Sequence, residues 1–182
     1  MKSSNVLTVK WIRASIIGAL YFALTVVIVP LSFGPIQVRV SELLAVLPFF
    51  FPEAIWGLTI GCLLANLFSP FGIVDIIGGT LCTFIAAYLT YLCRHIPRKT
   101  IGAYISILPP ILINGFGVSF YIASMAGGTF SLQNFSFPMY FSIAGTILVG
   151  EAISVGIGGS MLITYLLHQR SDVHSKKRQV AK

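Results

Sequence analysis

Long, nearly uninterrupted apolar stretches alternate with short polar segments along this chain. The clearest of these stretches cover residues 11–31, 73–93, 100–124 and 138–167. Because an α-helix rises about 1.5 Å per residue, about 20 apolar residues are enough to span the hydrocarbon core of a membrane. The pattern therefore predicts membrane-spanning helices at these positions.

The apolar stretch 40–68 can be interpreted either as one long helix or as two short ones. Pro52 follows three consecutive phenylalanines and is itself followed by Glu53. Proline and an acidic side chain are both favourable in the first turn of a helix. We therefore predict a short helix over about residues 40–51, a turn, and a second helix over about 53–68.

The overall composition agrees with a protein that lies in a membrane. Hydrophobic residues make up 56% of the 182 residues and charged residues only 9%, whereas soluble domains carry about 25% charged residues. A water-soluble fold of this length cannot bury so much apolar surface. The predicted fold class is all-α, an integral membrane six-helix bundle that forms a single transmembrane domain over residues 1–182.

The basic residues indicate which ends of the predicted helices face the cytoplasm. With six spans and a cytoplasmic N-terminus, eleven of the twelve lysines and arginines fall in inner segments, and only Arg39 lies outside. Five spans with an outer N-terminus give a poorer division, nine against three. The positive-inside rule therefore favours six spans with both termini cytoplasmic. Residues from about 169 to 182 then form a basic cytoplasmic tail that can rest on anionic lipid.

A few polar and charged side chains interrupt the apolar stretches, and the predicted topology places most of them in the outer half of the membrane. A charge at the bilayer centre costs about 3 kcal/mol, so such residues normally face a cavity or a partner. Glu151 is the hardest to explain structurally, because its own apolar stretch contains no basic residue. The candidate binding residues are Arg39, Glu42, Asn66, Asp75, Asn114 and Glu151.

Several of these residues also have a purely structural interpretation. Arg39 and Glu42 are three residues apart and are able to pair with each other. Asp75 suits the start of its helix, where the helix dipole favours an acid, and Asn114 is able to bridge two helices. Glu53 lies on the predicted inner side, beside Pro52, and is expected to be structural.

The chemistry of the candidate residues suits a planar heterocycle that is rich in N–H donors. Carboxylate and amide oxygens accept hydrogen bonds from such a solute. An anionic solute fits less well, because Arg39 is the only basic residue predicted on the outer side. Aromatic side chains that are able to stack on a flat ring are Phe68, Phe71, Phe116, Phe120, Tyr121 and Phe135.

The sequence lacks the motifs of common enzymes and ATPases. It contains no phosphate-binding loop of the P-loop type, no HExxH and no GxSxG. The three histidines fall at predicted inner ends or in the tail, so we expect no metal site and no cofactor on this chain. An intramembrane enzyme is therefore disfavoured. A stand-alone secondary transporter remains an alternative, although the internal symmetry typical of that class is not evident.

Two segments of the sequence resemble the QueT family. They are GPIQVRVSE at residues 34–42 with LLAVLP after it, and GCLLANLFSPFG at residues 61–72 leading into DIIGGT at residues 75–80. The resemblance is densest over about residues 34–95 and extends more loosely over nearly the whole chain. Members of this family are predicted substrate-binding (S) components of energy-coupling factor (ECF) transporters, which take up queuosine precursors.

The resemblance implies partners, a location and a substrate. The partners are a transmembrane scaffold protein and two cytoplasmic ATPases that use the ATP, and the location is the bacterial cell membrane. In S components an AxxxA face on the first helix meets the scaffold, and Ala19 and Ala23 match this pattern. The implied solutes are 7-deazaguanines, namely the 7-aminomethyl form preQ1, the 7-cyano form preQ0, or queuine. Glu151 or Asp75 would bind the guanine-like edge, and Glu42 would hold an aminomethyl cation.

Overall fold

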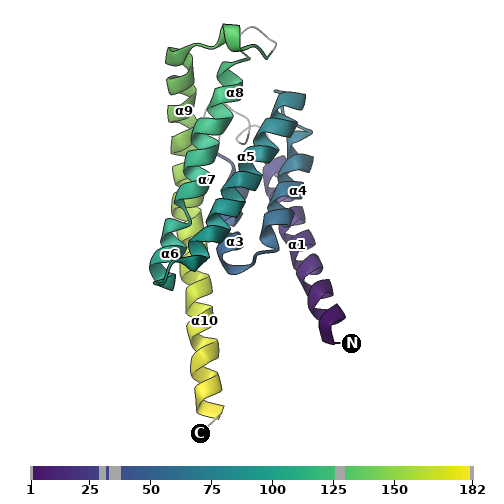
Figure 1. Cartoon of the computed structure of the whole chain (residues 1–182), viewed down its shortest axis with the longest axis vertical. Coiled ribbons are helices and arrows are strands. Elements are labelled where there is room, and N and C mark those ends of the chain that lie inside the picture. Colours follow the sequence, from purple (N-terminus) through teal and green to yellow (C-terminus); the bar gives the residue numbers. More distant parts are fainter. Residues whose placement is uncertain (1, 29–31, 33–37, 126–129, 181–182) are drawn as a thin grey trace.

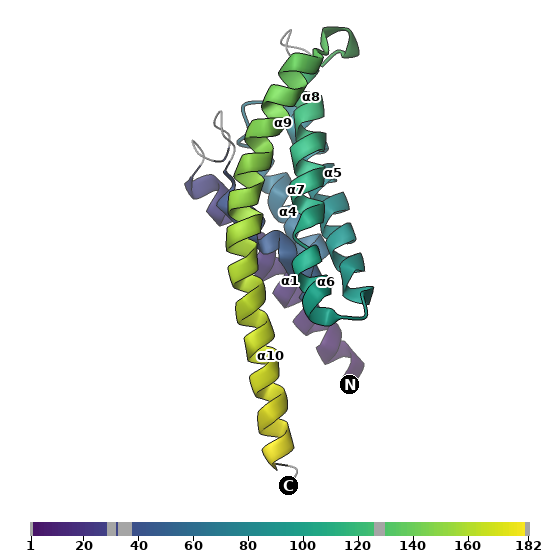
Figure 2. The same cartoon turned by 90° about the vertical axis from the view of Figure 1, so that its left-hand side faces the viewer.

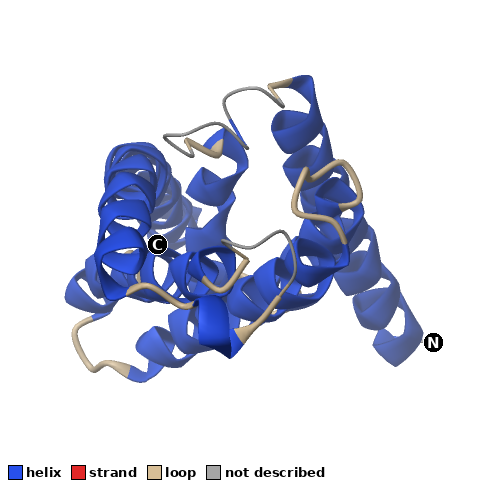
Figure 3. Ribbon diagram, turned by 90° about the horizontal axis from the view of Figure 1, so that it is seen from above, coloured by secondary structure: helices blue, strands red, loops and turns tan. Residues whose placement is uncertain are grey.

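A computed structural model of the chain describes residues 2–28, 32, 38–125 and 130–180. Every regular element among these residues is a helix (Figure 3). The predicted all-α fold class is therefore confirmed. In chain order the elements are α1 (Lys2–Val27), the 3₁₀ helix η1 (Val40–Val46), α3 (Leu47–Phe50), α4 (Ala54–Asn66), α5 (Ile73–Leu92), the 3₁₀ turn η2 (Cys93–His95), α6 (Lys99–Ile105), α7 (Leu108–Ile113), the π-helical turn η3 (Asn114–Val118), α8 (Ser119–Ala123), the 3₁₀ turn η4 (Leu132–Asn134), α9 (Phe137–Glu151), the π-helical segment η5 (Ala152–Gly159) and α10 (Ser160–Val180).

Long apolar helices occur where the hydrophobic pattern predicts them. Four of them have the length and composition needed to cross a membrane, and they cover Asn5–Val27, Ile73–His95, Lys99–Ala123 and Phe137–Ser171. Two shorter apolar helices cover Val40–Phe50 and Ala54–Asn66. The interpretation of this region as two short helices is thus confirmed, and that of one long helix is wrong. Whether the short helices complete a set of six spans stays a prediction.

The described ends of the chain lie toward the same end of the molecule (Figures 1 and 2). The turn between α5 and α6, which carries Arg94 and Lys99, lies toward that end as well (Figure 1). The segment from residue 169 onward continues as helix up to Val180. This arrangement is compatible with the predicted topology, but the cytoplasmic placement of the two ends stays a prediction.

Glycines allow α1 and α4 to pack with their backbones in contact. A β-carbon added at Gly57 would lie 2.4 Å from the carbonyl oxygen of Ala14, and one added at Gly61 would lie 2.6 Å from that of Gly18. Helices pack this closely in membranes because lipid provides no hydrophobic force to drive them together. The face of α1 that meets α4 is therefore the one with Ala14 and Gly18, and Ala19 is exposed at the edge of this contact.

The turn between α3 and α4 is fixed by two arginines from distant helices. Arg13 on α1 donates to Glu53 at 2.6 Å and lies over the ring of Phe51 at 4.6 Å. Arg170 on α10 lies over the ring of Phe50 at 5.1 Å. These contacts join the first helix, the last helix and the turn, and the structural interpretation of Glu53 is confirmed.

Apolar clusters hold the elements that carry the polar candidate residues. Leu58 of α4 belongs to a cluster shared by α1, α4 and η1. A second cluster packs Val46 of η1 near Val155 of η5, and a third packs Val118 of η3 near Ile147 of α9. The polar residues are thus presented by segments whose positions are set by close packing.

Candidate functional site

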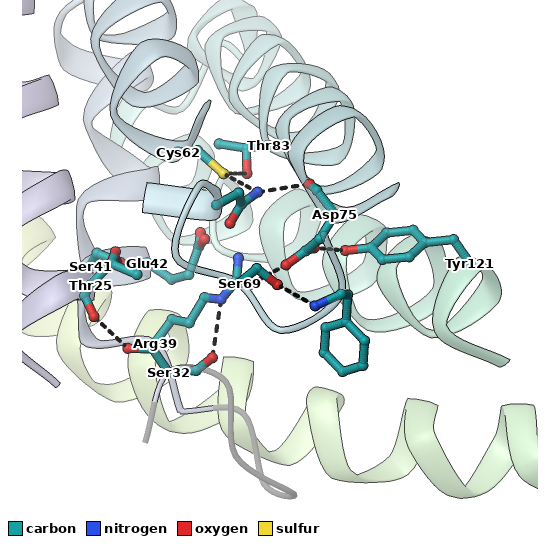
Figure 4. Close-up of polar contacts among 12 residues, drawn as sticks. Thr25, Ser32, Arg39, Ser41, Glu42, Cys62, Ser69, Asp75, Thr83 and Tyr121 are labelled. Carbon is teal, nitrogen blue, oxygen red and sulfur yellow. Dashed lines mark hydrogen bonds and ion pairs between the residues drawn. The ribbon is translucent and has the colours of Figure 1, made fainter. Parts of the chain in front are cut away.

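A buried ion pair joins the segment before η1 to the first turn of α5. A terminal nitrogen of Arg39 lies 3.5 Å from Oδ2 of Asp75, and both side chains are less than a tenth exposed (Figure 4). The Arg39 Nε also donates to the carbonyl oxygen of Ser32 at 3.3 Å. Gly72, with φ of 60°, precedes α5 and brings the chain into the helix that presents Asp75.

Besides Arg39, donors from two other helices reach Asp75. The Tyr121 hydroxyl donates to Asp75 Oδ1 (Figure 4). The Asn66 amide donates to the Asp75 carbonyl oxygen at 2.9 Å. Gly79 makes room for this convergence. A β-carbon there would lie 2.6 Å from Asn66 Nδ2, 2.8 Å from Asp75 Oδ1 and 3.2 Å from the Tyr121 hydroxyl. The absence of a side chain at Gly79 is therefore a condition for the site.

The carboxylate of Glu42 is held by a tyrosine of α1. The Tyr21 hydroxyl donates to Glu42 Oε1, and both side chains are almost completely buried. The neighbouring Thr25 and Ser41 hydroxyls share a hydrogen bond of 2.7 Å, which ties α1 to η1 (Figure 4). Glu42 therefore has a fixed orientation on the buried face of η1.

A second acid lies on α9 beside an amide from η3. Asn114 Nδ2 donates to Glu151 Oε1 at 3.0 Å, and both residues are about 95% buried. Asn114 is the first residue of the π-helical turn η3, and Glu151 is the last residue before the π-helical segment η5. Isolated π-helical turns are rare and occur frequently at functional sites.

Glu42 and Glu151 are carried by segments that pack against each other. Helix η1, which contains Glu42, contacts η5, which begins directly after Glu151: a β-carbon added at Gly158 would lie 3.1 Å from the β-carbon of Leu43. The Glu42 backbone N–H also donates to the Arg39 carbonyl oxygen at 3.0 Å. All six predicted residues therefore form one connected cluster, which we call the polar cluster: Arg39, Glu42, Asn66, Asp75, Asn114 and Glu151.

Several acceptor atoms of the polar cluster and its surroundings lack a hydrogen-bond partner among the described residues. A buried polar atom without a partner costs about 1–3 kcal/mol, so each such atom requires an explanation. Carbonyl and carboxylate oxygens dominate this set, which suits a ligand that donates hydrogen bonds. The atoms are Glu151 Oε2, Asn114 Oδ1, Asn66 Oδ1, Thr80 Oγ1 and Ser154 Oγ.

The structure decides between some of the alternative interpretations of these residues. Arg39 forms an ion pair with Asp75, on a different helix from Glu42. Asp75 is therefore more than an acid at a helix start. The interpretation of Asn114 as a bridge between two helices is confirmed by its bond to Glu151. None of this tests whether the polar cluster binds a solute, and that role stays a prediction.

Three contributors to the cluster are missing from the set of candidate binding residues. Tyr21 and Tyr121 donate to its carboxylates, and Gly79 leaves the space for three of its groups. A tyrosine inside an apolar span is a usable signal, because a buried hydroxyl usually finds a partner. Nothing in the sequence distinguishes Gly79 in this way, because it is one of 17 glycines in the chain.

The aromatic residues proposed for stacking divide into two groups. Phe68, Phe116 and Phe120 are about half exposed, so they face outward from the packed helices. Tyr121 is 6% exposed, and its hydroxyl is engaged with Asp75. Phe71 packs partly buried against the cluster of Val118 and Tyr121.

One groove lies away from the polar cluster, along the outside of α1 and α4. It has a volume of about 360 Å³, and Trp11 and Trp56 lie along it. Ala19 lines this groove, and Ala23 is exposed one turn further on. That the polar cluster lines a cavity large enough for a small solute stays a prediction.

Comparison with known proteins gives one family and one relative. A family model described as QueT transporter matches residues 11–168 of this chain. The queuosine precursor transporter QueT of Lactococcus lactis subsp. cremoris (strain MG1363) is 41% identical over 87 residues, which cover 47% of this chain and 50% of the relative. The matched part of the chain thus spans about half the length of that relative. No solved structure matches. Together with the four long apolar helices, the family match identifies a multi-pass membrane protein.

Proposed function

Because this chain belongs to the QueT transporter family, we propose that it is the substrate-binding membrane subunit of an ATP-driven ECF-type transporter for queuosine precursors. One observation supports this most directly. The buried Asn114–Glu151 pair presents acceptor atoms that no described residue satisfies. A 7-deazaguanine has the matching donors, an N1–H and an exocyclic amine on the same edge.

Glu151 is the better of the two acids considered for the guanine-like edge. The Asp75 carboxylate is already engaged by Tyr121 on one oxygen and by Arg39 near the other. Glu151 has one oxygen bound by Asn114 and a second oxygen without a partner among the described residues. A carboxylate with a free oxygen beside a free amide oxygen can accept two N–H groups from one ring edge.

Direct binding to the purified full chain tests this proposal. Titration calorimetry with the 7-aminomethyl form is expected to give saturable binding, and Glu151→Gln is expected to weaken it at least about tenfold, because a charge-assisted hydrogen bond is lost. Glu53→Gln is the matched control, since Glu53 contacts Arg13 and lies outside the polar cluster. Absence of binding by a well-folded sample, alone or with its scaffold, would refute solute capture.

The energy for uptake comes, in this proposal, from other chains. Six spans with both ends in the cytoplasm present α1 to a transmembrane scaffold in the bacterial cell membrane, and two cytoplasmic ATPases use ATP. The docking face contains Ala19 and Ala23, which are exposed on α1. Small exposed residues beside a groove of about 360 Å³ permit close approach of another helix.

Added bulk on this face tests the docking role. The double variant Ala19→Leu, Ala23→Leu is expected to abolish co-purification with the scaffold and uptake, and to leave the affinity for the solute unchanged. Ser142→Leu adds similar bulk to the exposed side of α9 and is expected to have no effect. Normal uptake by the double variant would refute the docking face. Uptake into vesicles without ATPases would instead identify a stand-alone secondary transporter.

A further inference from the structure

Three hollows follow one another along the outside of α1 and α4. The first lies beside the turn between α3 and α4, and Lys10 and Phe51 are in its wall. The second shares Lys10 and Glu53 with the first, and the third, the groove described above, shares Trp11 and Trp56 with the second. Their volumes are about 480, 240 and 360 Å³ in this order. Because neighbouring hollows have walls in common, they form one trough, which we call the α1–α4 trough.

The two ends of the α1–α4 trough differ in chemistry. Lys10, Arg13 and Glu53 line the first hollow. Arg170 lies over the ring of Phe50, which is in the same wall, at 5.1 Å. At this end three basic side chains therefore stand against one acid. The described residues that line the third hollow are aromatic, aliphatic or small, and none of them is charged. The trough is thus amphipathic along its length.

Lys10 is the basic residue of the trough that is available to a ligand. Its side chain is exposed and forms no ion pair or hydrogen bond with any described residue. Arg13, in contrast, donates to Glu53 at 2.6 Å and lies over the ring of Phe51 at 4.6 Å. A guanidinium group has five N–H donors, so Arg13 keeps further donors for an anion beside Lys10.

The α1–α4 trough is about as long as one leaflet of a membrane is deep. Along α1 it extends from Lys10 to Phe22, which is about 18 Å at about 1.5 Å per residue. Half of the hydrocarbon core of a bilayer measures about 15 Å. Trp11 and Trp56, both more than half exposed, lie between the charged end and the apolar groove. Tryptophan is enriched at the level of the lipid headgroups. The trough therefore has the dimensions of an amphipathic molecule with a charged head and a long chain.

We propose that the α1–α4 trough binds one anionic phospholipid, with its phosphate at Lys10 and Arg13 and one acyl chain in the groove up to Phe22. The ammonium and guanidinium groups donate to the phosphate oxygens. The chain covers apolar surface of α1 and α4 that is exposed on the described chain. This site is separate from the polar cluster and does not depend on the solute bound there.

The lipid has one consequence that rests on the proposed function. Ala19, which that function assigns to the scaffold contact, is in the wall of the same groove. A lipid chain and a scaffold helix cannot fill the groove together. The lipid therefore covers this face in the isolated chain and leaves when the scaffold docks.

Native mass spectrometry of the purified full chain tests the lipid site, with phosphatidylglycerol and phosphatidylcholine of identical acyl chains as probes. The wild type is expected to retain the anionic lipid at least about fivefold more than the zwitterionic one. Lys10→Gln is expected to lower retention of phosphatidylglycerol about fivefold, and Glu53→Gln, which removes the acid of the first hollow, to raise it. Neither variant should change retention of phosphatidylcholine.

A second set of variants separates the groove from the charged end. Ser15 lines the groove and is exposed, so Ser15→Leu fills part of it and is expected to weaken both lipids. Ser142→Leu adds the same bulk on the exposed side of α9, and Arg98→Gln removes a positive charge just before α6. Both controls lie outside the trough and are expected to change neither lipid.

Each alternative occupant gives a different result. Equal retention of the two lipids by the wild type would overturn the proposal, because the trough would then be ordinary lipid-facing surface. Equal losses in Lys10→Gln and Arg98→Gln would overturn it as well, since they would indicate attraction to net charge alone. Displacement of the lipid by glycerophosphoglycerol, which has the headgroup without the chains, would identify a site for a soluble anion instead. Titration of the same sample with the 7-aminomethyl form reports separately on the proposed function.

Discussion

Two arginine–carboxylate pairs in this protein have different environments, one partly exposed and one buried. Arg13 and Glu53 are 2.6 Å apart, and their side chains are 42% and 10% exposed, so this pair is the more exposed of the two. Arg39 and Asp75 are 3.5 Å apart, and their side chains are 7% and 1% exposed. The shorter contact lies at the turn between α3 and α4, and the longer one lies inside the polar cluster. Distance alone therefore does not indicate which pair matters more.

The difference lies in what each pair costs the protein. An exposed pair is screened by water and contributes about 0–1 kcal/mol, while a buried pair requires that both charges leave water. A protein keeps such a costly arrangement where it is needed for more than stability. The acceptor atoms without partners occur near Asp75 and Glu151 and not at the Arg13 turn. We therefore expect the buried pair to belong to the proposed binding site and the more exposed pair to stabilise the fold.

The largest expected effect comes from removing the arginine of the buried pair. Arg39→Met leaves Asp75 buried without a counter-charge and is expected to destabilise the fold by about 3–5 kcal/mol. Arg13→Met, the matched change at the exposed pair, is expected to cost no more than about 1 kcal/mol. Unfolding with sodium dodecyl sulfate, followed by circular dichroism, measures both. Similar losses for the two variants would contradict the comparison.

The next largest effect is expected at the glycine beside the buried pair. Gly79→Ala places a β-carbon 2.8 Å from Asp75 Oδ1, and overpacking of this kind is expected to cost about 1–3 kcal/mol. It should also weaken solute binding, because Asn66 and Tyr121 must shift. Gly145→Ala is the control, since a β-carbon there has no neighbour within 4 Å. Calorimetric titration of both variants measures the binding, and unchanged affinity in Gly79→Ala would separate the buried pair from the site.

A smaller effect is expected from the tyrosine that donates to the buried pair. Tyr121→Phe removes the donor to Asp75 Oδ1 and is expected to cost about 1–2 kcal/mol of unfolding free energy, because the acceptor stays buried. Tyr140→Phe removes a long hydrogen bond of 3.5 Å to the Phe116 carbonyl oxygen and is expected to be nearly neutral. The same detergent unfolding experiment compares them. Equal stability of the two variants would show that Asp75 does not depend on Tyr121.

The smallest effect is expected at the Arg13–Glu53 pair. Glu53→Gln removes the charge of the exposed pair but keeps the shape of the side chain, so the change in unfolding free energy is expected to stay below about 1 kcal/mol. The variant should bind the solute as the wild type does. A melting curve in detergent measures the stability. A loss as large as that of Arg39→Met would mean that the turn at Phe51 and Glu53 determines the fold more than its exposure suggests.

The positions of the helices could be predicted from the sequence because lipid allows few solutions. A spanning segment must be apolar and helical, so the pattern locates residues 73–93 and 100–124 almost directly. The break before Glu53 was also predictable, from Pro52 and the acid that follows it. The same logic places polar residues inside the protein, which is why all six candidates meet in one cluster.

The pairing of those residues could not be predicted, because it depends on how helices are rotated and packed. Sequence spacing favours Arg39 with Glu42, whereas the fold brings Asp75 to Arg39 and Tyr21 to Glu42. The π-helical segments have no comparable sequence signal, since their hydrogen-bond shift depends on the surrounding packing. The role of Gly79 depends on three side chains from other elements and emerges only from the fold.

The π-helical segment η5 has a consequence for the winding of the longest helix. It follows Glu151 directly and continues into α10, so the acid and the basic tail share one continuous rod (Figure 2). A π-helical turn holds one residue more than an α-helical turn. If the same residues were wound as a regular α-helix, the surplus residue would turn one half of the rod by roughly 100° against the other. Glu151 would then point away from Asn114, so the π-helical winding of η5 keeps these two side chains in contact.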